Sequence, residues 1–444
     1  MKPCTLQQLA DAMSGTLPKG GGELVISAGV STDTRKIADG TLFVALKGDR
    51  FDAHNFLGQA IASGAGALVI HDVASWPDGV PVILVKDTLQ ALQDLAKWYR
   101  HELGIPVVAI SGSNGKTSTK DLTRSVLSQR FRVNATLGNL NNHIGLPLTV
   151  LATKADDEVG VFEMGMNHAG ELAPLCEIAR PDISIITNVG SAHIEFLGSR
   201  DAIAHEKGTL ARALGEKGTL LVPSDCEYLD DYRASTAGTV LVVGEGSIRA
   251  ENVTAGVAGS TFDLVVDDVG RIATSISVPG RHMVSNALLA AGAGVVLGMT
   301  LEEISAGLEN ASLTTGRLRR FESKGVTVFD DTYNANPESI MAALQTLADH
   351  PTQGSRTAVL GKMAEQGEHA GPAYLRLGAL AGELGLRLVS VGFEAAGMKA
   401  PHHFETVEEA SGWLSGNTHP GDLVLFKGSR AAAIERVMNL AYPE

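Results

Sequence analysis

Residues 106–130 read PVVAISGSNGKTSTKDLTRSVLSQR, and this stretch decides how the rest of the chain is interpreted. The apolar run at 107–111 predicts a buried strand, and the residues from 116 onward predict a helix. Between them lie Gly112, Ser113, Asn114 and Gly115, whose glycines let the backbone amides turn toward an anion. A strand, a glycine-rich turn and a helix in this order are typical of a phosphate-binding loop.

The residues that open the predicted helix supply further groups for a nucleotide. A helix N-terminus carries partial positive charge. Lys116 adds a formal charge for the β- and γ-phosphates, the Thr117 hydroxyl suits Mg²⁺, and Ser118 follows in the same turn. Ile110 stands where a strict Walker A motif has its first glycine, so the match is to the shorter G-x-x-G-K-T form. An ordinary turn is the alternative, and the flanking strand and long helix favour a nucleotide site.

Strands and helices alternate on both sides of this loop. The runs at 159–165, 183–190 and 218–225 are continuously apolar and end in Gly, Asn or an acid, as strands buried on both faces do. The fold class is therefore α/β with three domains. We predict a small mixed unit at 1–87, a central domain at 88–313 with a mainly parallel sheet, and a doubly wound domain at 314–444.

Composition excludes several classes of protein. The chain has 444 residues, 44% of them hydrophobic, and a net charge of −14, which argues against disorder, nucleic-acid binding and a polybasic membrane surface. Its 3 cysteines form neither a disulfide nor a zinc pattern, which favours a reducing, cytoplasmic setting.

We find no signal peptide. The apolar segment at 287–299 falls short of the ~20 residues that a membrane span requires, so we predict a buried helix and no membrane insertion.

Two residues near predicted strand ends, Glu163 and His193, are candidates for chemistry. Glu163 lies at the end of the predicted strand in the run at 159–165, where a carboxylate would suit Mg²⁺ and where a capped turn is the alternative. His193 follows the run at 183–190. From the residues alone it is more often structural, because Mg²⁺ prefers oxygen ligands. Lys207 lies in a helical pattern and would ordinarily sit on a solvated face.

Taken together, the motifs resemble those of the Mur ligases, the ATP-dependent amide-forming enzymes of peptidoglycan precursor synthesis. The chain carries motifs in the same order as the family: SGSNGKTSTK, GNLNNHIGLPLTVL, FEMGMNHAGEL, ITNVGSAHIEFLGS, HEKG, PGRHMVSN, TGR and DDTYNANP. Near the N-terminus, the family's UDP-binding segment is resembled by STDTRKIADGTLFVALKGDRFDAHNF. The resemblance covers essentially the whole chain. Within the family, NLNNHIGLPLT, DDTYNANPES and LGKMAEQGEHA look like the member that adds D-alanyl-D-alanine.

The resemblance implies three domains: a UDP-binding domain, a P-loop ATPase-like domain and a C-terminal Rossmann-like domain. It implies ATP and Mg²⁺ as cofactors, UDP-N-acetylmuramoyl-tripeptide and D-alanyl-D-alanine as substrates, and a monomer. A peptide carboxylate would be phosphorylated by ATP, and an amine would then displace phosphate. Because several domains would face ATP, we expect an open form without ligands and closure of the C-terminal domain on binding.

The resemblance also assigns roles residue by residue. It makes Lys116, Lys207 and His193 catalytic, and it makes Thr117, Glu163, His193 and a carbamylated Lys207 the metal ligands. The residues that it places at ATP, besides residues 112–118, are Asn286, Arg317, Asp331, Asn334 and Asn336. Those that it places at the muramoyl substrate are Ser31, Thr32, Asp33, Thr34, Arg35, Lys47, Gly48, Asn141 and Asn142.

Alternatives stay open for some of these residues. Asn286 could instead cap a helix, and Asp331 could be a turn former. Lys427 could meet a substrate carboxylate or be an ordinary strand-end lysine.

Other functions are also possible. A ligase for a different amine, or a polyglutamylating enzyme, would share the chemistry. A P-loop ATPase or kinase would have no use for a UDP-binding segment. A non-catalytic UDP-sugar-binding protein would not need Lys116, Thr117 and Glu163 together.

Overall fold

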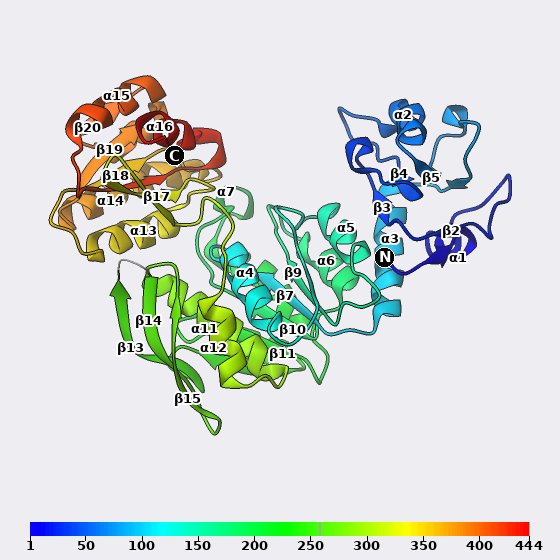
Figure 1. The fold of residues 1–444 in the computed structure, drawn as a ribbon, viewed down its shortest axis with the longest axis horizontal. Helices are drawn as coiled ribbons and strands as arrows, with labels where there is room; N and C mark the ends of the chain where they lie inside the picture. The colour runs from blue at the N-terminus through cyan, green and yellow to red at the C-terminus, as the bar shows by residue number, and fades with distance from the viewer. Residues whose placement is uncertain (257–258, 444) are drawn as a thin grey trace.

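The computed structural model describes residues 1–256 and 259–443 and contains three larger sheets that follow one another along the chain. In Figure 1 the blue N-terminal region and the orange-red C-terminal region stand over opposite ends of the central region. The three-part α/β architecture predicted from the sequence is confirmed.

The N-terminal region is built on a parallel sheet in the order β3-β4-β5-β6. Its strands are β3 (Val30–Ser31), β4 (Thr41–Val44), β5 (Ala65–Ile70) and β6 (Val82–Leu84), and α2 (Leu57–Ala62) packs against β5. A second, two-stranded sheet pairs β1 (Cys4–Thr5) with β2 (Val25–Ile26), beside α1 (Leu6–Ala12).

Helix α3 (Thr88–Leu103) joins this region to the central one. Asp87 caps it by accepting hydrogen bonds from the amides of Leu89 and Gln90, and Gly104 ends it with φ of 63°. Its apolar face packs against α5 (Gly145–Leu151) and α6 (Leu172–Ala179).

The central sheet has the order β15-β14-β13-β12-β11-β10-β7-β9-β8. Its strands are β7 (Val107–Ser111), β8 (Val133–Ala135), β9 (Val159–Glu163), β10 (Ile183–Ile186), β11 (Thr219–Pro223), β12 (Thr239–Val243), β13 (Ile248–Gly256), β14 (Gly259–Val266) and β15 (Gly270–Ile276). Strands β7 to β12 pair in parallel, whereas β13, β14 and β15 form an antiparallel extension that the sequence analysis did not predict.

Both faces of this sheet are covered. Val108 and Ile110 of β7 pack in the cluster that contains α4 (Lys116–Leu127) and α11 (Arg281–Val296), while Val107 and Ala109 pack with α3 and α5. The continuous apolar runs follow from this double burial. Most of the apolar segment predicted to be buried, 287–299, lies in α11, and α12 (Leu301–Glu309) follows.

The C-terminal sheet has the order β16-β17-β21-β18-β19-β20 and is parallel except for the β16–β17 pair. Its strands are β16 (Arg319–Ser323), β17 (Val326–Asp331), β18 (Arg356–Leu360), β19 (Arg387–Val391), β20 (His402–Phe404) and β21 (Leu423–Lys427). Its helices are α13 (Pro337–Asp349), α14 (Ala370–Glu383), α15 (Val407–Asn417) and α16 (Glu435–Ala441).

The remaining helices of the central region follow β10 and β11. They are α7 (Ile194–Leu197), α8 (Arg200–Lys207), α9 (Thr209–Arg212) and α10 (Leu229–Ser235). Within residues 1–256 and 259–443, no helix combines the length and the apolar character needed to cross a membrane.

All three cysteines are free thiols, as their spacing predicts. Cys4 and Cys176 are buried and Cys226 is partly buried. Burial raises the pKa of each thiol, and the pKa of Cys176 reaches about 12.

Candidate nucleotide and ligase site

The phosphate loop, residues 112–117, lies between β7 and α4, and its glycines have conformations that the turn requires. Gly112 has φ of 152° and Gly115 has φ of 78°. A Cβ atom at Gly112 would overlap the Thr187 hydroxyl, and one at Gly115 would lie 2.7 Å from Asn286 Oδ1. Both positions therefore exclude a side chain.

The end of β10 holds this loop in place. The Asn114 amide donates to Asn188 Oδ1 at 2.8 Å, and the Ser113 amide donates to the Asn188 carbonyl at 3.1 Å. The Thr187 hydroxyl donates to the Asn114 carbonyl, and the Gly190 amide donates to Ser113 Oγ. Thr187 and Asn188 were not predicted from the sequence, although their position just after a buried strand beside the loop is a signal of this role.

Lys116 folds back over the loop that it follows. Its Nζ donates to the Gly112 carbonyl at 2.7 Å. Burial lowers the pKa of Lys116, and the nearby Glu163 carboxylate partly offsets this shift. Thr117 and Ser118 are buried in the first turn of α4. An anion placed at the loop would meet a desolvated ammonium and the helix N-terminus together.

Glu163 ends β9 beside this loop, because Glu163 pairs in register with Ile110 of β7. Its Oε1 accepts a hydrogen bond from Asn141 Nδ2 at 2.8 Å. Its buried Oε2 has no hydrogen-bond partner in the described part of the chain. The carboxylate therefore does not cap a turn, and its open oxygen is a hard donor that suits Mg²⁺.

His193 and Lys207 approach the same region from the segment after β10. His193 has φ of 66°, and its Nδ1 lies 2.5 Å from Glu365 Oε2 of the C-terminal region. The close contact with the His193 imidazole lowers the pKa of Glu365. This contact with Glu365 was not predicted.

Lys207 is 1% exposed at the end of α8, so its interpretation as part of a solvated face is wrong. Burial, followed by the charge of Lys116, lowers its pKa well below the usual range, and Glu206 partly opposes both. Within residues 1–256 and 259–443 its ammonium has no hydrogen-bond or ion-pair partner. A lysine in such a site is readily neutral and nucleophilic.

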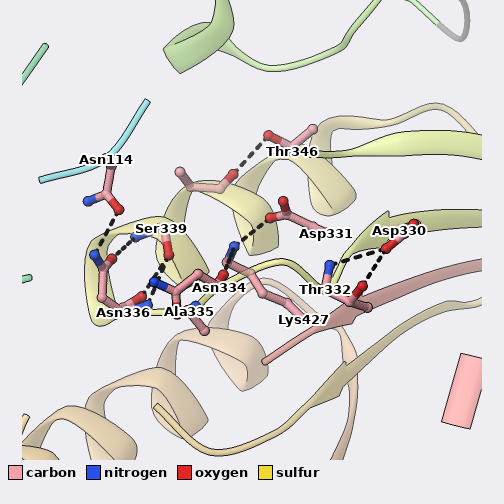
Figure 2. Close-up of polar contacts among 11 residues, drawn as sticks. Asn114, Asp330, Asp331, Thr332, Asn334, Ala335, Asn336, Ser339, Thr346 and Lys427 are labelled. Atoms are coloured by element: carbon pink, nitrogen blue, oxygen red, sulfur yellow. Dashed lines mark hydrogen bonds and ion pairs between the residues drawn. The ribbon is translucent and has the colours of Figure 1, made fainter. Parts of the chain in front are cut away.

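The C-terminal region reaches the phosphate loop through Arg317 and Asn336. Arg317 Nη2 donates to Thr117 Oγ1 at 3.3 Å, and its guanidinium lies 4.2 Å from the Tyr333 ring centroid. Asn336 caps α13 and donates from Nδ2 to Asn114 Oδ1 at 2.8 Å, as Figure 2 shows. In this structure the C-terminal region therefore already contacts the loop.

Two further contacts join the same two regions. The Ser191 amide donates to Glu338 Oε1 and the Ser191 hydroxyl to Glu338 Oε2, both at 3.0 Å. Glu338 and Glu365 were missed because nothing local in the sequence distinguishes a carboxylate that binds across a domain boundary.

Asp331 is held by an ion pair at the ends of two adjacent strands. Lys427 Nζ lies 2.6 Å from Asp331 Oδ2 and donates to the Asn334 carbonyl at 3.0 Å (Figure 2). Lys427 is 2% exposed, and burial lowers its pKa while Asp331 opposes the shift. It is therefore not an ordinary strand-end lysine. Asp331 is buried and paired, whereas Asn334 beside it is exposed.

Asn286 lies inside α11, whose N-cap residue is Gly280, so the helix-cap interpretation of Asn286 is wrong. It is buried, and Gly115 of the phosphate loop lies directly beside its side-chain amide. Asn286 is thus placed beside the phosphate loop.

The candidate residues for the muramoyl substrate lie in two places. Asn141 holds Glu163, and Asn142 Oδ1 accepts hydrogen bonds from the amides of Ile144 and Gly145 at the start of α5. Asn142 also lines a hollow with Gly165, Gly170 and Leu175. These two asparagines therefore lie next to the phosphate-loop site.

The other candidates, Ser31, Thr32, Asp33, Thr34, Arg35, Lys47 and Gly48, belong to the N-terminal region, which stands apart from the loop in Figure 1. Arg35 makes two hydrogen bonds to the Asp33 carboxylate, at 2.9 and 2.8 Å, and these lower the pKa of Asp33 to about 2. Lys47 lies 3.5 Å from Asp52. Both cations are exposed.

The residues present fit a nucleotide with a divalent cation. Asn114 Nδ2, Glu163 Oε2 and Arg317 Nε are buried polar atoms without a partner among the residues described, and all three lie around the phosphate loop. Within residues 1–256 and 259–443, no three or more His, Cys, Asp or Glu side chains are arranged together to hold a metal. A cation here would depend on Glu163, the Thr117 hydroxyl and phosphate oxygens.

Comparisons with known proteins agree with this arrangement. Residues 27–100 match the description "Mur ligase family, catalytic domain", residues 110–294 match "Mur ligase middle domain", and residues 316–430 match "Mur ligase, glutamate ligase domain". The UDP-N-acetylmuramoyl-tripeptide–D-alanyl-D-alanine ligase of Bacillus subtilis (strain 168) is 35% identical, over 98% of this chain and 97% of that protein.

Solved structures are similar over the same extent. A crystal structure of MurF from Acinetobacter baumannii is 32% identical, with a TM-score of 0.92 over 99% of each chain. MurF ligase from Thermotoga maritima in complex with ADP is 28% identical, with a TM-score of 0.84 over 93% of this chain and 96% of that one.

Proposed function

The chain belongs to the Mur ligase family, and we propose that it joins D-alanyl-D-alanine to UDP-N-acetylmuramoyl-tripeptide with ATP, releasing ADP and phosphate. One observation carries this proposal. Three buried, unpaired polar atoms surround a phosphate loop in a chain that is similar over its whole length to ligases of this specificity. The apparatus that would bind ATP is therefore combined with the domains that would bind both other substrates.

The reaction would proceed in two displacements. The terminal carboxylate of the tripeptide attacks the γ-phosphorus of ATP, the bond to the β-phosphate oxygen breaks, and ADP leaves. The amine of D-alanyl-D-alanine then attacks the acyl-phosphate carbonyl, inorganic phosphate leaves, and the nitrogen loses a proton. Catalysis consists mainly of positioning and charge neutralisation, because phosphoryl transfer needs little covalent work from side chains.

The phosphate loop and its neighbours take the roles at ATP. Lys116 and the loop amides of residues 112–118 hold the β- and γ-phosphates, and Arg317 adds a second cation from the C-terminal region. Asn286 faces the adenine. Asp331 faces the ribose, and Asn334 and Asn336 shape the surrounding loop. Mg²⁺, when bound, offsets charge on the transferred phosphoryl group.

Thr117 and Glu163 would hold this Mg²⁺. His193, together with Lys207 as a carbamate, would hold a second one, because a carbamate presents oxygen where an ammonium cannot. The low pKa and unpaired state of Lys207 support this modification, since carbon dioxide reacts with a neutral amine. We expect Lys207→Ala to lose most activity and to recover part of it with short carboxylic acids.

Substrate binding would join the first two regions. The muramoyl peptide would contact Asn141 and Asn142. The UDP part would be held by Ser31, Thr32, Asp33, Thr34, Arg35, Lys47 and Gly48. We propose boundaries between these functional units at residues 87 and 313, a monomeric protein and a cytoplasmic location. The C-terminal region already contacts the loop, so the compaction that small-angle scattering should show on binding of an ATP analogue and the UDP-linked substrate would come from the N-terminal region.

The test measures phosphate release from ATP with Mg²⁺ and UDP-N-acetylmuramoyl-tripeptide, with and without D-alanyl-D-alanine, and follows the product by mass spectrometry. We expect release that depends on the dipeptide and a product heavier by D-alanyl-D-alanine less water. Dependence on a different amine would assign the chain to another ligase activity. Release without an amide product would indicate an ATPase.

A further inference from the structure

Asp121, on the helix that follows the phosphate loop, contacts the segment that leads into the C-terminal region. We call residues 314–317 the linker. The Thr314 amide and the Thr314 hydroxyl both donate to Asp121 Oδ2, each at 2.8 Å. Asp121 is 7% exposed and lies four residues after Thr117, so the two side chains share one face of α4.

The other oxygen of Asp121 is also engaged. Lys120 Nζ lies 2.6 Å from Asp121 Oδ1 and donates to the Thr136 carbonyl at 3.2 Å. The Thr136 hydroxyl in turn accepts from the Glu163 amide at 2.9 Å. The carboxylate is therefore fixed by a buried ion pair, and this network continues to the strand end that carries Glu163.

The far end of the linker is held as well. The Gly316 carbonyl accepts from the Tyr333 amide at 3.3 Å, and the Arg317 guanidinium stacks over the Tyr333 ring. Leu318, the next residue, has φ of 54°. Residues other than glycine rarely adopt this left-handed backbone conformation, so surrounding contacts must maintain it. The direction of Arg317 thus depends on how both ends of a four-residue segment are anchored.

We propose that Asp121 is a positioning residue that fixes the start of the linker, so that Arg317 reaches the phosphates of a bound nucleotide. The anchor lies on the helix that begins at the phosphate loop, which places Arg317 relative to the loop itself. This inference rests on the proposed role of Arg317 at ATP and does not depend on which amine the enzyme uses.

The test removes the hydroxyl contact while keeping the shape of the side chain. Thr314→Val deletes one of the two hydrogen bonds to Asp121, and Thr314→Ser restores the hydroxyl. Ser125→Ala is the matched control, because Ser125 lies one turn farther along α4 and donates to the Gly307 carbonyl at 2.6 Å, away from the linker. The measurement is calorimetric affinity for a non-hydrolysable ATP analogue with Mg²⁺, together with the unfolding midpoint.

We expect Thr314→Val to weaken analogue binding about tenfold, because Arg317 would no longer be held where it can make a charge-assisted hydrogen bond to a phosphate. Thr314→Ser and Ser125→Ala should stay within about twofold of the wild type, since each keeps both bonds to Asp121. If Thr314→Val binds the analogue as Ser125→Ala does, the proposal is wrong.

A double-mutant cycle separates positioning from general destabilisation. In the Arg317→Met background, Thr314→Val should have no further effect on affinity, because the group that the anchor positions is gone. Independent, multiplicative effects would overturn the proposal. Failure of the proposed function would show differently, as wild-type protein that binds the analogue but forms no amide with D-alanyl-D-alanine.

Discussion

Around the phosphate loop, Asn114, Glu163 and Arg317 each have a buried polar atom with no partner among the residues that the structure describes. Asp33 and Arg35 in the N-terminal region instead pair with each other at the surface. Buried polar atoms without partners cost free energy, so a ligand that satisfies them gains affinity. An exposed pair must instead be opened before its cation can meet a diphosphate. The phosphate loop can therefore bind its ligand without breaking contacts of these atoms. The segment with Asp33 and Arg35 must first break its ion pair.

This difference predicts that substitutions at the loop affect the chemical step, while those at Asp33 and Arg35 affect mainly one substrate. Four substitutions test this contrast, from the largest expected effect to the smallest.

Lys116→Met should reduce kcat/KM for ATP about 10³-fold, because it removes a desolvated charge from the transferred phosphoryl group. The measurement is phosphate release under saturating UDP-linked substrate. Lys97→Met is the control, since Lys97 forms a surface ion pair with Glu177 and should leave the rate unchanged. A loss of less than tenfold would remove the phosphate loop from the chemical step.

Glu163→Gln should lower activity about 10²-fold and shift the Mg²⁺ dependence to higher concentration. The amide oxygen of the substituted side chain would still accept from Asn141, so the fold of the strand end should survive. Activity is measured across a Mg²⁺ titration, with Glu177→Gln as a surface control. An unchanged Mg²⁺ midpoint would mean that the unpaired oxygen is not a ligand.

Arg35→Gln should raise KM for the UDP-linked substrate about tenfold and leave KM for ATP unchanged. The reason is that the guanidinium would exchange the Asp33 carboxylate for the diphosphate. Initial rates with each substrate varied in turn provide the test. If KM for ATP changed instead, the contrast between the two regions would fail.

Asp33→Asn should change the dependence of stability on pH, and only slightly. The pKa of Asp33 is lowered from 3.8 to about 2, so its stabilising effect is present above pH 3.8 and is lost as pH falls through 2. Because the pair is exposed, the unfolding midpoint at neutral pH should drop by less than about 2 °C. Thermal unfolding from pH 2 to 7 measures this, and a larger drop would indicate a more rigid segment.

The elements around the phosphate loop could be predicted because local signals agree there. The apolar run of β7 and the glycines of the turn each identify their own element without help from distant residues. The antiparallel strands β13–β15 were missed because β13 is mostly half-buried or exposed and carries charged side chains such as Arg249 and Glu251. Such a strand gives no continuous apolar run.

The contacts that assemble the site were beyond prediction from the sequence. Asp121 and Thr314 are 193 positions apart, and Lys427 and Asp331 are 96 apart. Each of these residues reads locally as an ordinary polar side chain of a helix, loop or strand end. The first pairing depends on how the central and C-terminal regions pack, and the second depends on β17 lying beside β21 in one sheet. The spacing along the chain encodes neither arrangement.

The buried thiols have a practical consequence for fluorescence labelling. Maleimide dyes react with the thiolate, and burial disfavours that form at Cys4, Cys176 and Cys226. The natural chain should therefore give little background. Cysteines introduced by Asp78→Cys and Phe393→Cys, at two exposed positions in the first and last regions, would carry a dye pair whose energy transfer reports their separation during turnover.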